Sequence, residues 1–157
     1  MTNSLSPVLK QTSDVVVDHA EGMYVYSTDG KKYLDLTSGI GVLATGHCHP
    51  KVTKAAQEQC ASVVHAQYAI MKHQPLLELS QRIASLFPAY IDTVFFSNAG
   101  TEAVETSIRL ARQSTGKPNI IAFRGCFHGR TMGSLSTTSS SAAVRQRVHP
   151  LMGGVVT

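Results

Sequence analysis

The sequence predicts an α/β fold built around a parallel β-sheet, and three features lead to that prediction. An apolar run at 93–96, an amphipathic stretch at 101–114 and an apolar run at 119–123 follow one another within about thirty residues, which is typical of a β-α-β unit. Such a unit needs further strands beside it. A β-branched run also begins in the closing LMGGVVT, so we expect a sheet that is incomplete in this chain.

The segment 14–36 predicts a β-meander. Its stretch MYVYSTDGKKYLDL places two β-rich runs around Asp29-Gly30, a dipeptide that favours a tight hairpin turn. The stretch TSGIGVLATGHCHP that follows has three glycines and predicts a loop. That loop ends at Pro50, a residue suited to the first turn of a helix.

Two amphipathic helices are predicted next. Apolar residues recur at three- and four-residue spacing from Pro50 to about residue 64, and again from Pro75 to Leu86, before Pro88 ends the pattern. Each helix therefore has one apolar face, which we expect to face the core.

The stretch FFSNAGTEAVETSIRLAR, residues 95–112, has the properties of an anion site. Gly100 and Thr101 open the predicted helix, so their N–H groups have no partner within it, and the helix dipole favours negative charge there. Ser97 and Asn98 could bond the anion or cap the helix. An ordinary helix N-cap is the alternative interpretation of this string.

Two other nucleotide-loop patterns fit poorly. Gly116-Lys117 lacks the first glycine of a P-loop and is followed by Pro118. GIGVLA at 39–44 matches Gly-x-Gly-x-x-Ala, but it continues into another glycine loop instead of a helix.

An aromatic residue is expected beside the anion site. The stretch RGCFHGRTMGS, residues 124–134, directly follows the second strand of the β-α-β unit. Loops at the carboxyl ends of parallel strands gather at one edge of a sheet, so Phe127 and His128 should lie near Gly100 and Thr101. A flat ring beside a phosphate site indicates a phosphorylated heteroaromatic ligand.

These stretches, together with YLDLTSGIGVLATGHCHPKV, resemble class III aminotransferases, the pyridoxal-phosphate family that includes 4-aminobutyrate, ornithine and acetylornithine aminotransferases. The resemblance runs from about residue 14 to residue 157. It implies fold type I, with a small-domain segment in residues 1–50 and the start of the large cofactor domain in residues 51–157. It also implies pyridoxal 5'-phosphate as cofactor and amino-donor and 2-oxo acid substrates.

The resemblance assigns roles to cofactor-binding residues. In the family, the residues matching Gly100 and Thr101 bind the cofactor phosphate through backbone N–H groups. The residue matching Phe127 stacks on the pyridine ring, and His128 follows at the edge of that ring.

For the substrate, the resemblance implies that Arg130 meets a carboxylate, as in acetylornithine aminotransferases, and that Ile40 lies by the substrate pocket. Aminomutases and a decarboxylase share the scaffold, so transamination is the favoured chemistry among several. The resemblance further implies a homodimer whose interface includes 37–50.

No catalytic residue is expected in this chain. In relatives, the lysine that bonds the cofactor and the aspartate that faces its ring nitrogen lie well beyond position 157. None of the seven lysines here matches that site, so we expect an N-terminal fragment that is inactive alone.

Composition limits the other classes of function. The chain has 157 residues, 43% hydrophobic and 15% charged, which is typical of a globular protein. Its net charge of +4 is scattered, so we expect no nucleic-acid partner, although a non-catalytic basic binding module is the rival hypothesis. The basic excess could serve a phosphate-bearing ligand or be balanced by acidic sequence outside the chain.

The sequence offers neither a secretory signal nor a transmembrane run. The odd number of cysteines favours reduced thiols in a cytoplasmic protein. His47-Cys48-His49 is expected to bind no metal, because adjacent ligands rarely complete a tetrahedral site. Glu102 and Glu105 are assigned to favourable contact with the dipole of their own helix.

Overall fold

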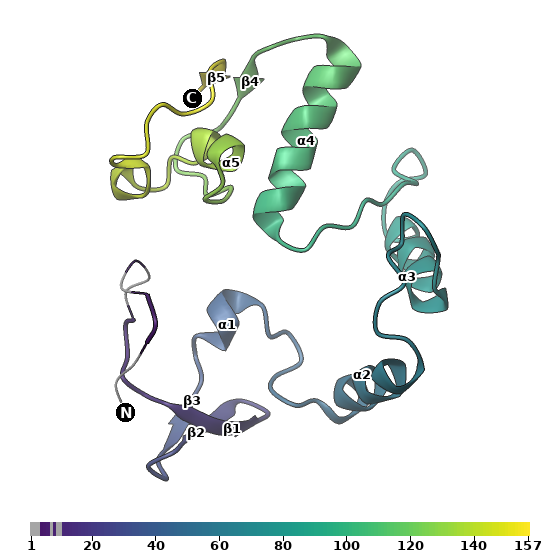
Figure 1. The fold of residues 1–157 in the computed structure, drawn as a ribbon, viewed down its shortest axis with the longest axis vertical. Helices are drawn as coiled ribbons and strands as arrows, with labels where there is room; N and C mark the ends of the chain where they lie inside the picture. Colours follow the sequence, from purple (N-terminus) through teal and green to yellow (C-terminus); the bar gives the residue numbers. More distant parts are fainter. Residues whose placement is uncertain (1–3, 7, 9–10) are drawn as a thin grey trace. The chain divides into compact units, whose positions relative to one another are not determined.

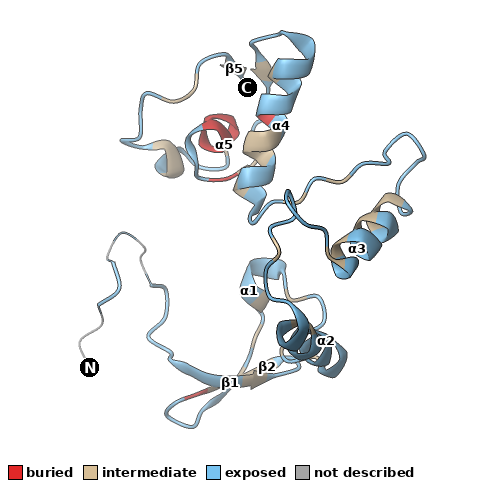
Figure 2. Cartoon of the chain, turned by 45° about the vertical axis from the view of Figure 1, so that its right-hand side comes forward, coloured by how far each residue is buried: buried red, intermediate tan, exposed pale blue. Residues whose placement is uncertain are grey.

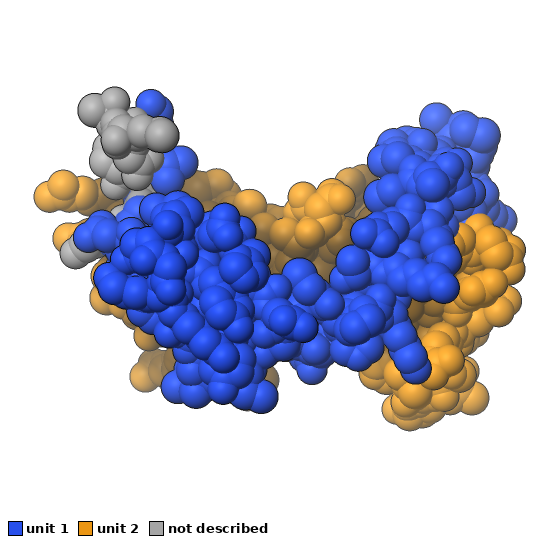
Figure 3. All heavy atoms as spheres, turned by 90° about the horizontal axis from the view of Figure 1, so that it is seen from below, with its two compact units in different colours: residues 1–73 blue, residues 74–157 orange. Residues whose placement is uncertain are grey.

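The computed structural model describes residues 4–6, 8 and 11–157, and part of the predicted N-terminal segment lies outside these residues. Contacts divide the chain into two compact units, residues 1–73 and 74–157 (Figure 3). The domain boundary predicted at residue 50 concerns a whole enzyme and stays a prediction.

The elements in chain order are β1 (Val17–Glu21), β2 (Tyr24–Ser27), β3 (Lys32–Leu34), α1 (Ser38–Gly41), α2 (Pro50–Ser62), α3 (Gln74–Ala84), α4 (Gly100–Thr115), β4 (Ile120–Ile121), α5 (Met132–Thr137), the 3-10 helix η1 (Ala142–Arg145) and β5 (Val155–Val156) (Figure 1).

The first unit contains the predicted β-meander. Strands β1, β2 and β3 pair antiparallel in that order, and Tyr26 lies opposite Lys32 across the hairpin. Gly30 closes the turn with a φ of 81°, and its N–H donates to the Ser27 carbonyl at 2.9 Å. A positive φ is accessible to glycine without steric cost, which explains why the Asp-Gly pair predicted this turn correctly.

Helices α2 and α3 form where the apolar periodicity predicted them, but their apolar faces are not buried. Neither helix has a buried residue, and Val52 of α2 is 54% exposed. The expectation that both face the core is therefore wrong for the described chain. Periodicity identifies which side of a helix is apolar, whereas burial needs a second element to cover that side.

The second unit contains the parallel pair. Ile120 of β4 lies opposite Val155 of β5, and Ile121 lies opposite Val156, so the closing β-branched run is a strand as expected. The strand predicted at 93–96 is not formed, because the sheets of the described residues contain only β1–β3 and β4–β5. An extended segment becomes a strand only when a neighbour supplies hydrogen bonds, and β4 pairs with β5 instead.

The core of the second unit is small and centred on α5 (Figure 2). Its buried apolar side chains are Ile108 of α4, Ala122 and Leu135. Four Ser and Thr side chains between residues 134 and 138 are also buried, so much of this core carries hydroxyl groups. Buried hydroxyl groups need hydrogen-bond partners, so this region is organised by polar contacts as much as by apolar packing. Within the described ranges, no helix is both long and apolar enough to span a bilayer.

Candidate functional site

Helix α4 begins at the predicted anion site, which we call the anion turn and define as Gly100 and Thr101. Ala99 precedes it with extended backbone, at φ −149° and ψ 157°, and no side chain caps the helix. Among the described residues, the N–H groups of Gly100 and Thr101 donate to no acceptor. Apart from its chain neighbours and the backbone of its own helix, a Cβ added at Gly100 would meet no atom within 4 Å. The anion turn therefore presents two unpaired donors to open space.

The alternative of an ordinary N-cap is not observed. The Ser97 hydroxyl donates to the Ala99 carbonyl at 3.3 Å, and no helix N–H donates to the Ser97 oxygen among the described residues. Asn98 donates its backbone N–H and its side-chain amide to Glu102, at 2.7 and 3.1 Å. Neither side chain therefore caps the helix, and the backbone N–H groups of the anion turn stay unpaired, while Glu102 in the first turn lies favourably in the helix dipole.

An open pocket of about 520 Å³ lies in front of the anion turn and is built wholly from the second unit. Phe127 and Arg130 lie on its wall, and the Arg130 guanidinium carbon is 5.8 Å from the centre of the Phe127 ring. Phe127 is 55% exposed, so its ring is partly open to the pocket. The lining residues are Ala99, Gly100, Thr101, Val104, Phe127, His128, Gly129 and Arg130. Five of the six residues singled out in the sequence are therefore brought together.

Two hydroxyl groups, of which Thr138 is buried, fix the loop that carries Phe127. The His128 N–H donates to the Thr138 hydroxyl oxygen at 2.9 Å, and Ser139 accepts from the Gly125 N–H at 2.9 Å. Gly129 packs so closely on Thr101 that a Cβ there would lie 2.6 Å from the Thr101 Cβ. The loop is thus held against the first turn of α4.

Glu105 has a partner that the sequence did not indicate. Its carboxylate accepts the Thr131 hydroxyl at 2.6 Å and the backbone N–H groups of Gly133 and Ser134 at 2.8 and 3.0 Å. Glu105 therefore caps α5. The expectation that it interacts with the dipole of its own helix is wrong. The Thr131 hydroxyl first, and then the two backbone N–H groups, hold the pKa of Glu105 below its usual value of 4.5.

Ile40, the sixth predicted residue, belongs to the first unit and to the left-handed turn α1. Its φ is 64° and its side chain is 90% exposed. Positive φ is costly for a β-branched residue, and strain of this kind is concentrated at functional sites. The role of Ile40 at a substrate pocket stays a prediction.

Asp35 holds this turn in place. Its carboxylate accepts the N–H groups of Thr37 and Ser38, each at 2.9 Å, and pairs with His47 Nε2 at 2.8 Å. The Ser38 N–H first, and then the His47 ring, lower the pKa of Asp35. The sequence pattern alone did not reveal this contact, although an Asp side chain that accepts N–H groups a few residues later is a known turn-capping pattern.

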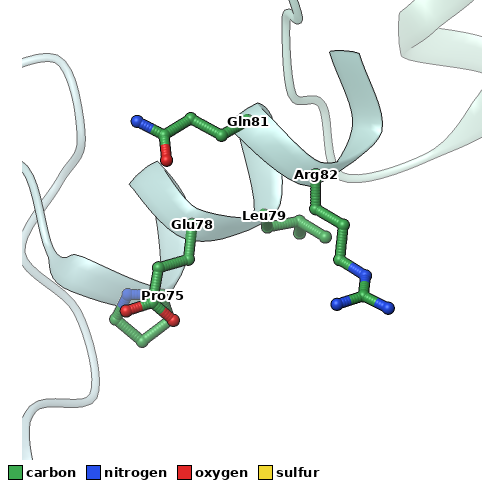
Figure 4. Close-up of a pocket in the computed structure, with 5 residues that line it drawn as sticks. All are labelled: Pro75, Glu78, Leu79, Gln81 and Arg82. Atoms are coloured by element: carbon green, nitrogen blue, oxygen red, sulfur yellow. The ribbon is translucent and has the colours of Figure 1, made fainter. Parts of the chain in front are cut away.

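Two other features do not compete with this site. A hollow along α3 is lined by Pro75, Glu78, Leu79, Gln81 and Arg82, all from one exposed helix, and Gln81 and Arg82 point away from each other (Figure 4). In the described part of the chain, no cluster of His, Cys, Asp and Glu side chains could hold a metal ion. The three cysteines are unpaired.

Comparisons with known proteins agree with the geometry. Residues 6–157 match the family model described as Aminotransferase class-III. The chain is 38% identical over 153 residues to a 2-aminoadipate transaminase of Pseudomonas putida, covering 97% of this chain and 37% of that protein. It is 35% identical over 144 residues to an isoleucine 2-epimerase of Lentilactobacillus buchneri, covering 91% and 32%.

Among solved structures, a thermostable (S)-enantioselective omega-transaminase from Thermomicrobium roseum is similar, with a TM-score of 0.87 at 30% identity. That match covers 98% of this chain and 37% of the other. The chain therefore spans about a third of the length of these relatives.

Proposed function

Because the chain belongs to the class III aminotransferase family, we propose that it is the N-terminal part of a pyridoxal-phosphate-dependent aminotransferase. The enzyme moves an amino group between an ω-amino or basic amino acid derivative and a 2-oxo acid such as 2-oxoglutarate. One observation carries this proposal: a single pocket joins an uncapped helix N-terminus, an exposed aromatic ring and a guanidinium group.

The residues present fit the cofactor. Its phosphate needs unpaired donors and space. The anion turn offers two free N–H groups, and no atom beyond its chain neighbours and its own helix backbone lies within 4 Å of the place where a Gly100 Cβ would stand. The helix dipole adds about 0.3–1 kcal/mol for an anion at such a position. Phe127 supplies a flat face for the pyridine ring, and His128 lies beside it. When bound, pyridoxal phosphate supplies an electron sink that stabilises negative charge on the substrate.

Arg130 is the proposed substrate contact in this chain. Guanidinium groups bind carboxylates through two parallel hydrogen bonds, and the contact with Phe127 places this group next to the ring-stacking face. A substrate carboxylate at Arg130 would lie within reach of the cofactor ring.

The catalytic lysine is proposed to lie outside this chain. No lysine is among the residues that line the pocket. Lys117 is the only lysine between residues 74 and 157, and it follows the far end of α4. With a rise of 1.5 Å per residue, that end is about 24 Å from the anion turn. The ring-nitrogen aspartate is proposed to lie outside as well.

The exact reaction and assembly are also proposals. One similar protein is named an epimerase, so other chemistry on the same scaffold is the second candidate. We further propose a cytoplasmic homodimer whose interface includes 37–50. A basic nucleic-acid-binding module is the rival class, and it would show salt-sensitive binding to DNA or RNA.

The test compares the 157-residue chain with the complete enzyme. Each is mixed with pyridoxal phosphate, and absorbance is recorded before and after borohydride is added. Borohydride reduces an imine between a lysine and the cofactor to an amine that does not dissociate. We expect weak, reversible binding and no amino-donor turnover for the chain, and a stoichiometric adduct with turnover for the complete enzyme. A stoichiometric adduct on one lysine of the chain, together with turnover, would contradict the proposal.

A further inference from the structure

Three hydroxyl groups and one carboxylate join α4 to α5 next to the anion turn, and we call them the hydroxyl cluster. The Thr101 hydroxyl oxygen lies 2.8 Å from that of Thr131 and 2.6 Å from that of Ser134. Thr131 and Ser134 are 2.9 Å apart, and the Thr131 hydroxyl reaches Glu105 at 2.6 Å. The hydroxyl cluster therefore consists of Thr101, Glu105, Thr131 and Ser134.

Glu105 sets the direction of the hydrogen bonds in this cluster. An ionised carboxylate can only accept, so the Thr131 hydroxyl must donate its proton to Glu105. The Thr131 hydroxyl oxygen can then only accept from the Thr101 and Ser134 hydroxyl groups. The Thr101 hydroxyl proton stays inside the cluster, bonded to the oxygen of Thr131 or of Ser134. The side chain of Thr101 is thus committed to the cluster, while its backbone N–H remains free for a ligand.

The same contacts hold the end of the loop 125–131, which carries Phe127. Thr131 directly follows Arg130, and Glu105 also accepts the first N–H groups of α5. Because Glu105 is one helical turn after Thr101 on α4, it ties the end of the loop 125–131 to the helix that begins at the anion turn. Glu105 itself does not line the pocket.

We propose that Glu105 is a positioning residue for the cofactor site: acting through Thr131, it holds Phe127 and Arg130 at a fixed place relative to the anion turn. The inference rests on the proposed function. A phosphorylated ring must reach the anion turn and the Phe127 face together, so its affinity depends on their separation. Inorganic phosphate needs the anion turn alone. Glu105 therefore affects the two ligands differently.

The experiment measures both ligands on the complete enzyme. Affinities for pyridoxal phosphate and for inorganic phosphate are compared in wild type, Glu105→Ala, Glu105→Gln and Thr131→Val. Glu78→Ala is the matched control, because Glu78 is an exposed helical glutamate of the same unit that bonds only Gln74 in its own helix. Amide hydrogen exchange over 125–134, measured without cofactor, reports directly whether the loop is held.

For Glu105→Ala we expect about tenfold weaker binding of pyridoxal phosphate, as lost hydrogen bonds to a charged group imply. We expect phosphate affinity within about twofold of wild type and faster exchange over 125–134. Glu105→Gln, which keeps an accepting oxygen, should recover part of the loss. Adding Thr131→Val to Glu105→Ala should cost little more, since both remove the same contact.

Two results would overturn the inference. One is unchanged pyridoxal phosphate affinity in Glu105→Ala and Thr131→Val, and the other is an equal loss for phosphate, which would make Glu105 merely structural. If Glu105→Ala does not fold, Thr131→Val and Glu105→Gln give the same comparison. A wild-type enzyme that bound no pyridoxal phosphate would refute the proposed function itself, and this inference with it.

Discussion

Replacing Gly129 by alanine should destabilise the second unit because the added methyl group has no room. Gly129 has a φ of 137°, a conformation that side chains rarely adopt. Its Cβ would lie 2.6 Å from the Thr101 Cβ and 2.5 Å from the Ser134 hydroxyl oxygen. These atoms belong to the hydroxyl cluster, so they cannot move without breaking hydrogen bonds.

The expected cost has two parts. Unfavourable backbone conformation contributes about 1–3 kcal/mol, and forcing a methyl group into a packed site contributes about 1–3 kcal/mol more. Gly125 separates the two parts, because its φ is 80° but its Cβ would meet nothing within 4 Å. Gly129→Ala should therefore lose about 2 kcal/mol more than Gly125→Ala, roughly a 30-fold difference in the unfolding equilibrium.

Urea unfolding of the complete enzyme, followed by far-ultraviolet circular dichroism, measures this difference from the shift in midpoint at constant slope. Exchange at amides 127–134 shows whether the loss is local to the loop. If Gly129→Ala were no less stable than Gly125→Ala, the close packing between the loop and the first turn of α4 would be refuted.

Three further predictions concern binding, pH and assembly. Phe127→Ala should weaken pyridoxal phosphate binding about three- to tenfold in a fluorescence titration, while Phe123→Ala, another exposed phenylalanine of this region, should not; equal effects would exclude ring stacking. The pKa of Glu105 is lower in the folded state, so its contribution to the free energy of unfolding is complete above pH 4.5 and is lost as pH falls through the folded-state pKa. The free energy of unfolding should therefore fall less steeply with decreasing pH in Glu105→Gln than in the wild type. An unchanged pH profile in this variant would refute the prediction. Val42→Asp should weaken the proposed dimer in light scattering, and a fully dimeric variant would show that 37–50 is not at the interface.

The sequence determined the local structure wherever one residue type dictates the backbone. Asp29-Gly30 predicted the hairpin because glycine accepts the positive φ that its turn requires. The order of strand-forming and helix-forming runs predicted that Phe127 would lie near Gly100, and the pocket contains both, although the first strand on which this prediction relied is not formed. The predicted family and fold type are confirmed by the matches to class III aminotransferases.

Only the tertiary structure decided which partners the polar and apolar side chains find. Glu105 was assigned to its own helix, yet it bonds Thr131, 26 residues later in the chain, because the fold brings α5 against α4. Helices α2 and α3 form where they were predicted, but no residue of either is buried, because burial depends on which elements are present to cover a helix. Sequence periodicity specifies the character of a surface, whereas hydrogen bonds and burial require a second group to approach it in space.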